Sequence, residues 1–348
     1  MAIGWKGVFP AVTTQLRADL SIDLADTQRV VDDLVKDGVT GVIALGTVGE
    51  NNSLEYDEKV SVLSAIVEVV DGRVPVITGV SEYDTRRAVR YAQAAEKAGA
   101  DGLMLLPPMV YVPKAHELVA HFKGVADQTG LPIMLYNNPP AYRTVIDQEV
   151  LTALVDVKNI VAVKESAPDT RRFTDFRNAF GDRYTLFAGL DDVALEGLYL
   201  GAQGWVSGLT NAFPKESVEL VRAFERGDHA KAMEIYRWFM PLLHLDAEHD
   251  LVQSIKLAEE VMGRGSERVL PPRYVLQGER RAEVIAMVER PLRRVRTCLS
   301  PRRPDRERRC VTPSSASMAI RPGTPSASSR AGRRCSRARP CRNGGRIS

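Results

Sequence analysis

The chain has 348 residues, of which 44% are hydrophobic, which is enough for one large globular domain or two ordinary ones. No stretch approaches the roughly 20 apolar residues that a transmembrane helix needs. The first residues lack the charged and apolar regions of a signal peptide. The composition argues against a membrane protein and predicts a cytoplasmic location.

The net charge of +3 is distributed unevenly along the chain. Residues 298–348 carry 13 arginines, no lysine and 2 acidic residues, a net +11, so residues 1–297 must carry −8 for the total to be +3. All four cysteines also lie in this segment, with no CxxC pair among them. Neither a zinc site nor a disulfide framework is predicted.

The segment 298–348 is rich in Arg, Ser and Pro, has few large apolar residues, and is predicted to be disordered. One interpretation is an arm that binds nucleic acid non-specifically. The other is that the abrupt change in composition reflects translation of a GC-rich gene in a shifted reading frame. We favour the second interpretation, so no specific nucleic-acid partner is predicted.

Eight short apolar segments between residues 7 and 208 read as buried strands. In chain order they are GVFPAVT (7–13), GVIALG (41–46), VPVITGV (74–80), GLMLLPP (102–108), PIMLYNN (132–138), IVAVKES (160–166), TLFAG (185–189) and GWVSG (204–208). Amphipathic helical patterns such as Leu24–Asp37 and Asp84–Ala98 separate them. Eight βα units in roughly 210 residues predict a (β/α)₈ TIM barrel. A doubly wound open sheet is less favoured, because no GxGxxG fingerprint follows the first strand.

Four more helical patterns follow the eighth strand, over Lys215–Glu225, His229–Leu242, Leu251–Met262 and Glu279–Val288. They exceed the single helix that would complete the barrel. The predicted organisation is therefore a barrel over residues 1–226, a small C-terminal helical region over 227–297 and the tail 298–348.

Unusual residues gather at the carboxyl ends of three predicted strands, which is where barrel enzymes carry their chemistry. The turn GTVGEN (Gly46–Asn51) follows the second strand, Tyr136 lies at the end of the fifth, and Lys164 closes the sixth. A lysine among apolar residues has its charged form disfavoured, which lowers its pKa toward the range where the neutral amine attacks a carbonyl. Lys164 is therefore the predicted Schiff-base former.

A Schiff-base enzyme also has to move protons and hold its substrate. The phenol of Tyr136 can transfer protons if a hydroxyl such as that of Thr47 relays them. The successive backbone N–H groups of Gly46, Thr47, Val48 and Gly49 can form a nest for the carboxylate of a 2-oxo acid. This combination predicts a catalytic lysine, tyrosine and threonine, with no metal and no cofactor.

The sequence also allows two other interpretations. The stretch HLDAEHD contains His244, Asp246, Glu248, His249 and Asp250, a composition that suits a divalent metal and a metal-dependent aldolase. A solvated helix surface explains it better, because only His244 and Glu248 would share a helix face. The other alternative is a barrel that only binds, with the basic tail as a nucleic-acid arm.

The motifs GTVGEN, YNNP and IVAVKE, with GLDD and GWVSG, resemble the dihydrodipicolinate synthase and N-acetylneuraminate lyase family over residues 5 to about 295. The resemblance implies a (β/α)₈ barrel with a helical extension, usually in homotetramers, that acts on small 2-oxo acids as a class I aldolase or lyase. It implies Lys164 as Schiff-base former, Tyr136 as proton donor and acceptor, and Thr47 as relay. Further candidate substrate-binding residues are Gly46, Val48, Gly49, Asn138, Tyr142, Gly189, Asp191, Val206 and Ser207.

The sequence departs from the family synthases at three places. Val48 stands where GTTGE has its second threonine. Met109 and Val110 stand where the synthases have adjacent tyrosines after the fourth strand, and a tyrosine follows only at Tyr111. Ala141 stands where YNxPxRT has its arginine. Arg143 lies two residues later than that arginine. These departures argue against a site for a dicarboxylic product.

YNNPPAY, GVFPAVTT and GTVGEN look most like the branch that deaminates Δ1-pyrroline-4-hydroxy-2-carboxylate to 2-oxoglutarate semialdehyde. The open alternatives are a 2-keto-3-deoxy sugar acid aldolase or dehydratase and 4-hydroxy-tetrahydrodipicolinate synthase. For a sugar acid, Asp191, Asp192 and Ser207 are the candidate polyol ligands.

Overall fold

The computed structural model describes residues 4–108 and 110–298. Eight parallel strands form its centre: β1 (Gly7–Pro10), β2 (Val42–Ala44), β3 (Val76–Val80), β4 (Gly102–Leu105), β5 (Ile133–Asn137), β6 (Ile160–Glu165), β7 (Thr185–Ala188) and β8 (Gly204–Ser207). Strands β2 to β8 pair in chain order, and β1 pairs with β8. A bridge between Ala11 and Ile43 brings β1 to β2. The predicted (β/α)₈ TIM barrel is confirmed.

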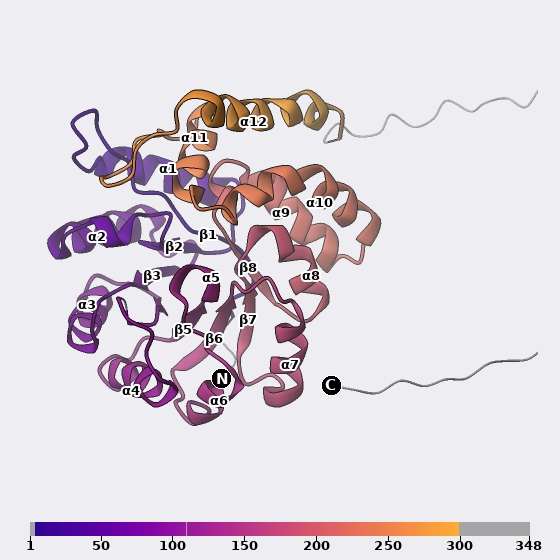
Figure 1. Cartoon of the computed structure of the whole chain (residues 1–348). Helices are drawn as coiled ribbons and strands as arrows, with labels where there is room; N and C mark the ends of the chain where they lie inside the picture. Colours follow the sequence, from indigo (N-terminus) through magenta and orange to yellow (C-terminus); the bar gives the residue numbers. More distant parts are fainter. Residues whose placement is uncertain (1–3, 109, 299–348) are drawn as a thin grey trace, which may run out of the picture. The chain divides into compact units, whose positions relative to one another are not determined.

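Helices surround the barrel, as Figure 1 shows. They are α1 (Leu24–Lys36), α2 (Tyr56–Val70), α3 (Thr85–Lys97), α4 (Ala115–Ala126), α6 (Gln148–Ala153), α7 (Arg171–Phe180), α8 (Ala194–Tyr199) and α9 (Pro214–Glu225). The short helix α5 (Pro139–Tyr142) follows β5 and lies inside this ring in Figure 1. Helical turns η1 (Asn51–Ser53), η2 (Asp191–Val193) and η3 (Leu209–Asn211) follow β2, β7 and β8. The turns therefore lie at the carboxyl ends of strands, next to the predicted site.

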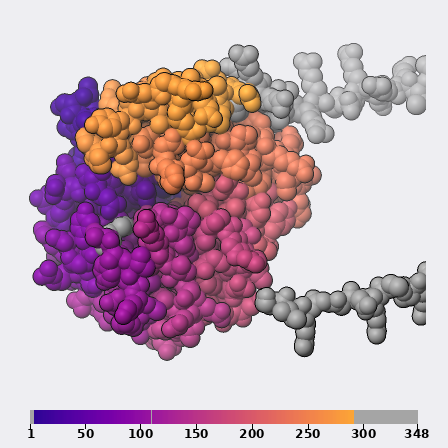
Figure 2. All heavy atoms as spheres, in the orientation of Figure 1, coloured from indigo at the N-terminus to yellow at the C-terminus, as the bar shows by residue number. Residues whose placement is uncertain are grey.

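The chain continues after α9 with α10 (His229–Leu243), the turn η4 (His244–Asp246), α11 (Leu251–Val261) and α12 (Gly278–Cys298). The four predicted C-terminal helices are present, and α12 extends ten residues beyond the predicted end at Val288. In Figures 1 and 2 the orange residues of α11 and α12 lie along one side of the barrel. The predicted tail lies outside the described residues, apart from Cys298, and no described helix is long and apolar enough to cross a membrane.

Side chains alternate between the barrel interior and the layer beneath the helices. The interior is filled by a separate apolar cluster that includes Phe9, Ile77, Met104, Met134 and Phe187. Glycines in or next to the strands make room for its rings: a Cβ on Gly41 would collide with Phe9, and one on Gly204 would collide with Phe187. Because the interior is packed, polar groups face substrate only at the barrel's ends.

Candidate active site

Lys164 and Tyr136 lie side by side inside the carboxyl end of the barrel. They are register partners on β6 and β5, and the Lys164 Nζ atom lies 4.1 Å from the centre of the Tyr136 ring. Each side chain is about 5% exposed. The strand register thus brings the two principal predicted residues together.

Burial is the main influence on Lys164 and lowers the pKa of its amine. The carboxylates of Asp246 and Asp191 and the phenol of Tyr142 act in the opposite direction, because negative charge favours the ammonium form. The desolvation effect is the largest of these influences. The site therefore favours a neutral amine, which is the nucleophilic form.

The phenol of Tyr136 accepts a hydrogen bond from the Asn138 side-chain amide, at 2.8 Å. Burial raises the pKa of Tyr136 to about 12, and the bond from Asn138 opposes this rise. Tyr136 therefore carries its proton at neutral pH and can donate it. Asn138 supplies the orientation that a proton donor requires.

Tyr142 connects Tyr136 to the turn after β2. Its ring packs edge to face on that of Tyr136, with centres 5.7 Å apart, and its hydroxyl lies 2.8 Å from the Thr47 hydroxyl. The short helix α5 presents Tyr142 there, and its first turn is capped by Asn138, whose side chain accepts from the Ala141 N–H at 3.1 Å. Thr47 thus joins the site through Tyr142, a link that the sequence did not predict.

The turn formed by residues 46–49 has unused backbone donors. Among the described residues, none of its four N–H groups donates to a carbonyl or a side chain, whereas the next N–H, of Glu50, bonds to the Thr47 carbonyl at 3.0 Å. Leu45 adopts a left-handed φ of 54°, and the Asn51 amide donates to its carbonyl at 2.9 Å. This conformation leaves the predicted nest free to receive a carboxylate.

The predicted substrate-binding residues at the ends of β7 and β8 contact other protein groups. Asp191 is buried and accepts hydrogen bonds from the Trp205 indole at 2.9 Å, the Ser207 hydroxyl at 3.0 Å and the Leu209 N–H at 2.9 Å. Val206 belongs to the apolar interior cluster. Asp191 and Ser207 thus bond mainly to each other and to the protein.

Gly189 leaves room for the lysine. A Cβ at this position would lie 2.8 Å from the Lys164 Cγ atom and would collide with the Ser166 hydroxyl. Any larger residue after β7 would therefore displace the Lys164 side chain.

The HLDAEHD stretch forms η4 and the turn after it, so it is not the regular helix that was expected, although His244, Glu248 and His249 are exposed as expected of a solvated surface. His244 lies 2.9 Å from an Asp192 oxygen, while Glu248 and Asp250 are ion-paired with Arg280 at 2.6 and 2.8 Å. Within the described residues no cluster of three or more His, Cys, Asp or Glu could hold a metal ion. Asp246 is turned toward the barrel.

The departures from the family synthases can be located as well. Val48 is buried, whereas Ala141 and Arg143 are exposed on the α5 loop, with Arg143 in a left-handed conformation. Val110 is 88% and Tyr111 55% exposed. Met109 lies outside the described residues.

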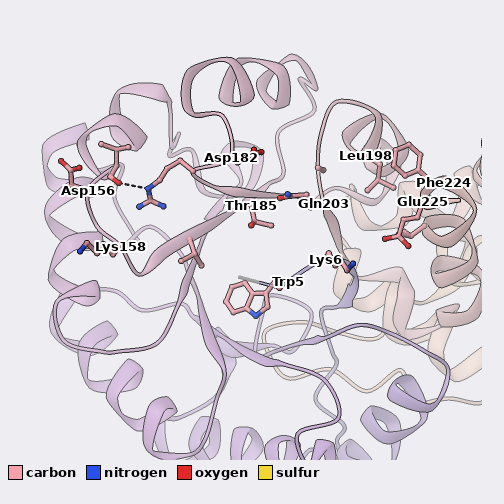
Figure 3. Close-up of a pocket in the computed structure, with 16 residues that line it drawn as sticks. Trp5, Lys6, Asp156, Lys158, Asp182, Thr185, Leu198, Gln203, Phe224 and Glu225 are labelled. Atoms are coloured by element: carbon pink, nitrogen blue, oxygen red, sulfur yellow. Dashed lines mark hydrogen bonds between the residues drawn. The ribbon is translucent and has the colours of Figure 1, made fainter. Parts of the chain in front are cut away.

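A cavity of about 1110 Å³ lies at the opposite end of the barrel. Figure 3 shows Trp5, Lys6 and Gln203 among its lining, all at or just before the first residues of strands. None of the predicted site residues lines it. We place the active site at the carboxyl end, where the buried lysine and phenol meet.

Comparison with known proteins identifies the family of the chain. Residues 4–290 match the Dihydrodipicolinate synthetase family. The 4-hydroxy-tetrahydrodipicolinate synthases of Rhodopseudomonas palustris (strain BisA53) and Methanocaldococcus jannaschii are both 34% identical to the chain, over 77% and 75% of its length and 90% and 89% of theirs. The crystal structure of YagE, a prophage protein of the dihydrodipicolinic acid synthase family from E. coli K12, in complex with pyruvate, is 30% identical with a TM-score of 0.79 and covers 83% of this chain and 99% of its own.

Proposed function

The chain belongs to the dihydrodipicolinate synthetase family and is a lyase of that family, and from this premise we propose that Lys164 forms a Schiff base with C2 of a 2-oxo acid or its cyclic imine. The observation that carries the proposal is the buried amine of Lys164, 4.1 Å from the centre of the Tyr136 ring. An amine with a lowered pKa beside a phenol that keeps its proton has the nucleophile and the acid that imine formation requires. No metal or cofactor takes part in this mechanism.

The remaining site residues receive roles from their positions. Tyr142 and Thr47 relay protons between Tyr136 and solvent, and the N–H groups of residues 46–49 bind the substrate carboxylate. The barrel of residues 1–226 carries these groups, and the helical region of 227–297 supports them. The resemblance implies a homotetramer, and the exposed apolar side chains of residues 110–112 offer a surface for a subunit contact.

We propose Δ1-pyrroline-4-hydroxy-2-carboxylate as the substrate in preference to the dicarboxylic product of the synthases. The relatives named 4-hydroxy-tetrahydrodipicolinate synthase make that reaction the main alternative. A dicarboxylic product needs a second carboxylate ligand, and this chain has Ala141 where the synthases carry an arginine. A substrate with one carboxylate needs only the nest of residues 46–49.

The proposed reaction balances as follows. Attack of Lys164 on C2 opens the pyrroline ring and leaves its nitrogen as an amine on C5. Loss of a proton from C3 gives an enamine, whose electrons form a C3–C4 double bond as the C4 hydroxyl leaves as water. The double bond then migrates to give an imine at C5. Hydrolysis at C5 releases ammonia, and hydrolysis at C2 releases 2-oxoglutarate semialdehyde and frees Lys164.

A 2-keto-3-deoxy sugar acid aldolase or dehydratase is less well supported. The candidate ligands for its polyol are Asp191, Asp192 and Ser207. Asp191 and Ser207 bond to each other at 3.0 Å, and Asp192 is occupied by His244. A polyol would have to displace these bonds.

The pyrroline reaction can be followed by coupling semialdehyde formation to an aldehyde dehydrogenase. We expect NADH production that depends on the pyrroline and on this protein. No signal with the pyrroline, together with rapid pyruvate release from a keto-deoxy sugar acid, would exclude the deaminase in favour of an aldolase.

Replacement of Tyr136 by phenylalanine tests the proton transfers. We expect borohydride to trap the pyruvate adduct still, because Lys164 remains, while turnover falls by about 100-fold or more, the usual effect of losing a general acid–base. Tyr184→Phe is the matched control, since it removes another buried hydroxyl, which donates to the Leu151 carbonyl. Equal turnover of Tyr136→Phe and the wild type would contradict the role of Tyr136.

A further inference from the structure

Asp246, the last residue of η4, reaches the active site from the C-terminal helical region. A Cβ on Gly208, immediately after β8, would collide with an Asp246 carboxylate oxygen. The carboxylate therefore lies against the backbone at the carboxyl end of β8. Sequence reasoning assigned Asp246 no role at this end of the barrel.

Contacts on both sides of Asp246 fix its position. His244, at the start of η4, lies 2.9 Å from a carboxylate oxygen of Asp192 in η2, and Leu245 is 1% exposed. Ile255 of α11 also packs against Gly208. Because the turn is held by a polar contact and by apolar packing, the direction of the Asp246 side chain is set by the fold.

The Asp246 carboxylate acts on both principal site residues. Of the charged groups that favour the ammonium form of Lys164, Asp246 is the strongest, and it also raises the pKa of the Tyr136 phenol. The Asp246 residue is partly exposed although its carboxylate is desolvated, and the backbone N–H of Asp191 is the one hydrogen-bond donor among the described residues that lowers the pKa of this carboxylate. Asp191, in contrast, is fully engaged by three protein donors. Asp246 thus has oxygen atoms available to a molecule bound at Lys164.

We propose that Asp246 is the general acid that protonates the departing C4 hydroxyl of a 4-hydroxylated substrate held as an imine on Lys164. This inference rests on the proposed function. Tyr136 protonates the ring nitrogen as that nitrogen leaves C2, and the resulting phenolate takes the C3 proton, which restores the phenol. The enamine electrons form the C3–C4 double bond, the C4–O bond breaks, and the proton of Asp246 leaves with the oxygen as water. Asp246 regains a proton from solvent.

Acidity favours Asp246 over Tyr136 for this step. Burial raises the pKa of Asp246 to about 6, although Lys164 opposes the rise, whereas the pKa of Tyr136 is about 12. An acid whose pKa lies near the working pH is both protonated often enough and strong enough to assist a leaving hydroxyl. The groups that face Asp246 are Lys164 on β6, Tyr136 on β5, Asp191 and Asp192 on η2, and His244 on its own turn.

This role makes the elimination of the C4 hydroxyl depend on pH. The protonated form of Asp246 is the active one and is lost as the pH rises through about 6. Elimination of the hydroxyl should therefore slow above this pH. The elimination rate of a leaving group that needs no proton should not fall over this pH range.

The test compares Δ1-pyrroline-4-hydroxy-2-carboxylate with its 4-chloro analogue, since chloride leaves without a proton and both give the same semialdehyde. In Asp246→Asn we expect turnover of the hydroxy substrate to fall by about 100-fold and to lose its decline with rising pH. Turnover of the chloro analogue should stay within about twofold of the wild type. Borohydride trapping of pyruvate on Lys164 should persist, because removing the negative charge favours the neutral amine further.

Two further variants serve as checks on this experiment. Glu248→Gln is the matched control, an acid-to-amide change two residues away at an exposed ion pair with Arg280, and should process both substrates normally. Asp246→Ala should reproduce the pattern of Asp246→Asn, and the melting temperature of each variant shows whether it folds.

Equal slowing of both substrates in a folded variant, or undiminished turnover of the hydroxy substrate, would overturn the role of Asp246. Wild-type protein that traps pyruvate but does not release semialdehyde from the hydroxy substrate would overturn the inference together with the proposed substrate. Failure of the wild type to trap pyruvate at all would instead remove the Schiff-base mechanism, so the two failures are distinguishable.

Discussion

Lys164→Ala is expected to abolish both turnover and covalent capture of the substrate. The variant lacks the nucleophile, and no other group in the site can form an imine, because the hydroxyls of Tyr136, Tyr142 and Thr47 cannot replace an amine. The measurement is the mass of the protein after treatment with pyruvate and borohydride, followed by peptide mapping. We expect a single irreversible adduct in the wild type, on the peptide that contains Lys164, and none in the variant.

Lys158→Ala is the matched control for this experiment. Lys158 precedes β6, the strand that carries Lys164 near its carboxyl end, but Lys158 is exposed and lines the cavity at the other end of the barrel. Its loss should leave capture and turnover unchanged. An adduct on a peptide without Lys164, or capture that depends on Lys158, would place the reactive amine elsewhere.

The barrel and its central lysine were predictable because local patterns determine them. A parallel strand covered on both faces is a short apolar run, and all eight runs became strands, each trimmed by one or more residues at its ends. A charged residue such as Lys164 at the end of such a run is conspicuous. Because parallel strands end at the same rim, the meeting of Lys164 and Tyr136 followed from chain order alone.

The contacts that support the site were not predictable, because they join residues far apart in the sequence. The Tyr142 hydroxyl meets Thr47 across 95 positions, and no spacing rule links α5 to the turn after β2. Asp246 was misjudged because helical periodicity was extended through HLDAEHD, whereas the chain forms a short turn there that faces the barrel. Periodicity identifies a helix face, but it cannot identify where a helix stops and the next side chain turns inward.

A buried ion pair connects the C-terminal helices to the substrate-binding turn. Glu50, which follows Gly49 and adopts a left-handed φ of 57°, lies 2.8 Å from the Lys256 ammonium on α11, and both side chains are fully buried. Lys256 also donates to the Thr14 carbonyl at 2.9 Å, and the Leu270 N–H donates to Glu50 at 2.8 Å. The pair therefore holds the turn that carries Thr47 against α11.

Lys256→Met is consequently expected to destabilise the protein by about 3–5 kcal/mol, because it leaves the Glu50 carboxylate buried without its counter-charge. The double variant Glu50→Gln with Lys256→Met should recover much of this loss, since it removes the uncompensated charge. Chemical denaturation of the wild type, the single variant and the double variant under the same conditions measures these differences in the free energy of unfolding. Lys215→Met removes an exposed lysine from its pair with Asp37, which keeps Arg264 as a partner, and should cost less than about 1 kcal/mol. A Lys256→Met protein as stable as the Lys215→Met control would show that the buried pair does not hold the turn in place.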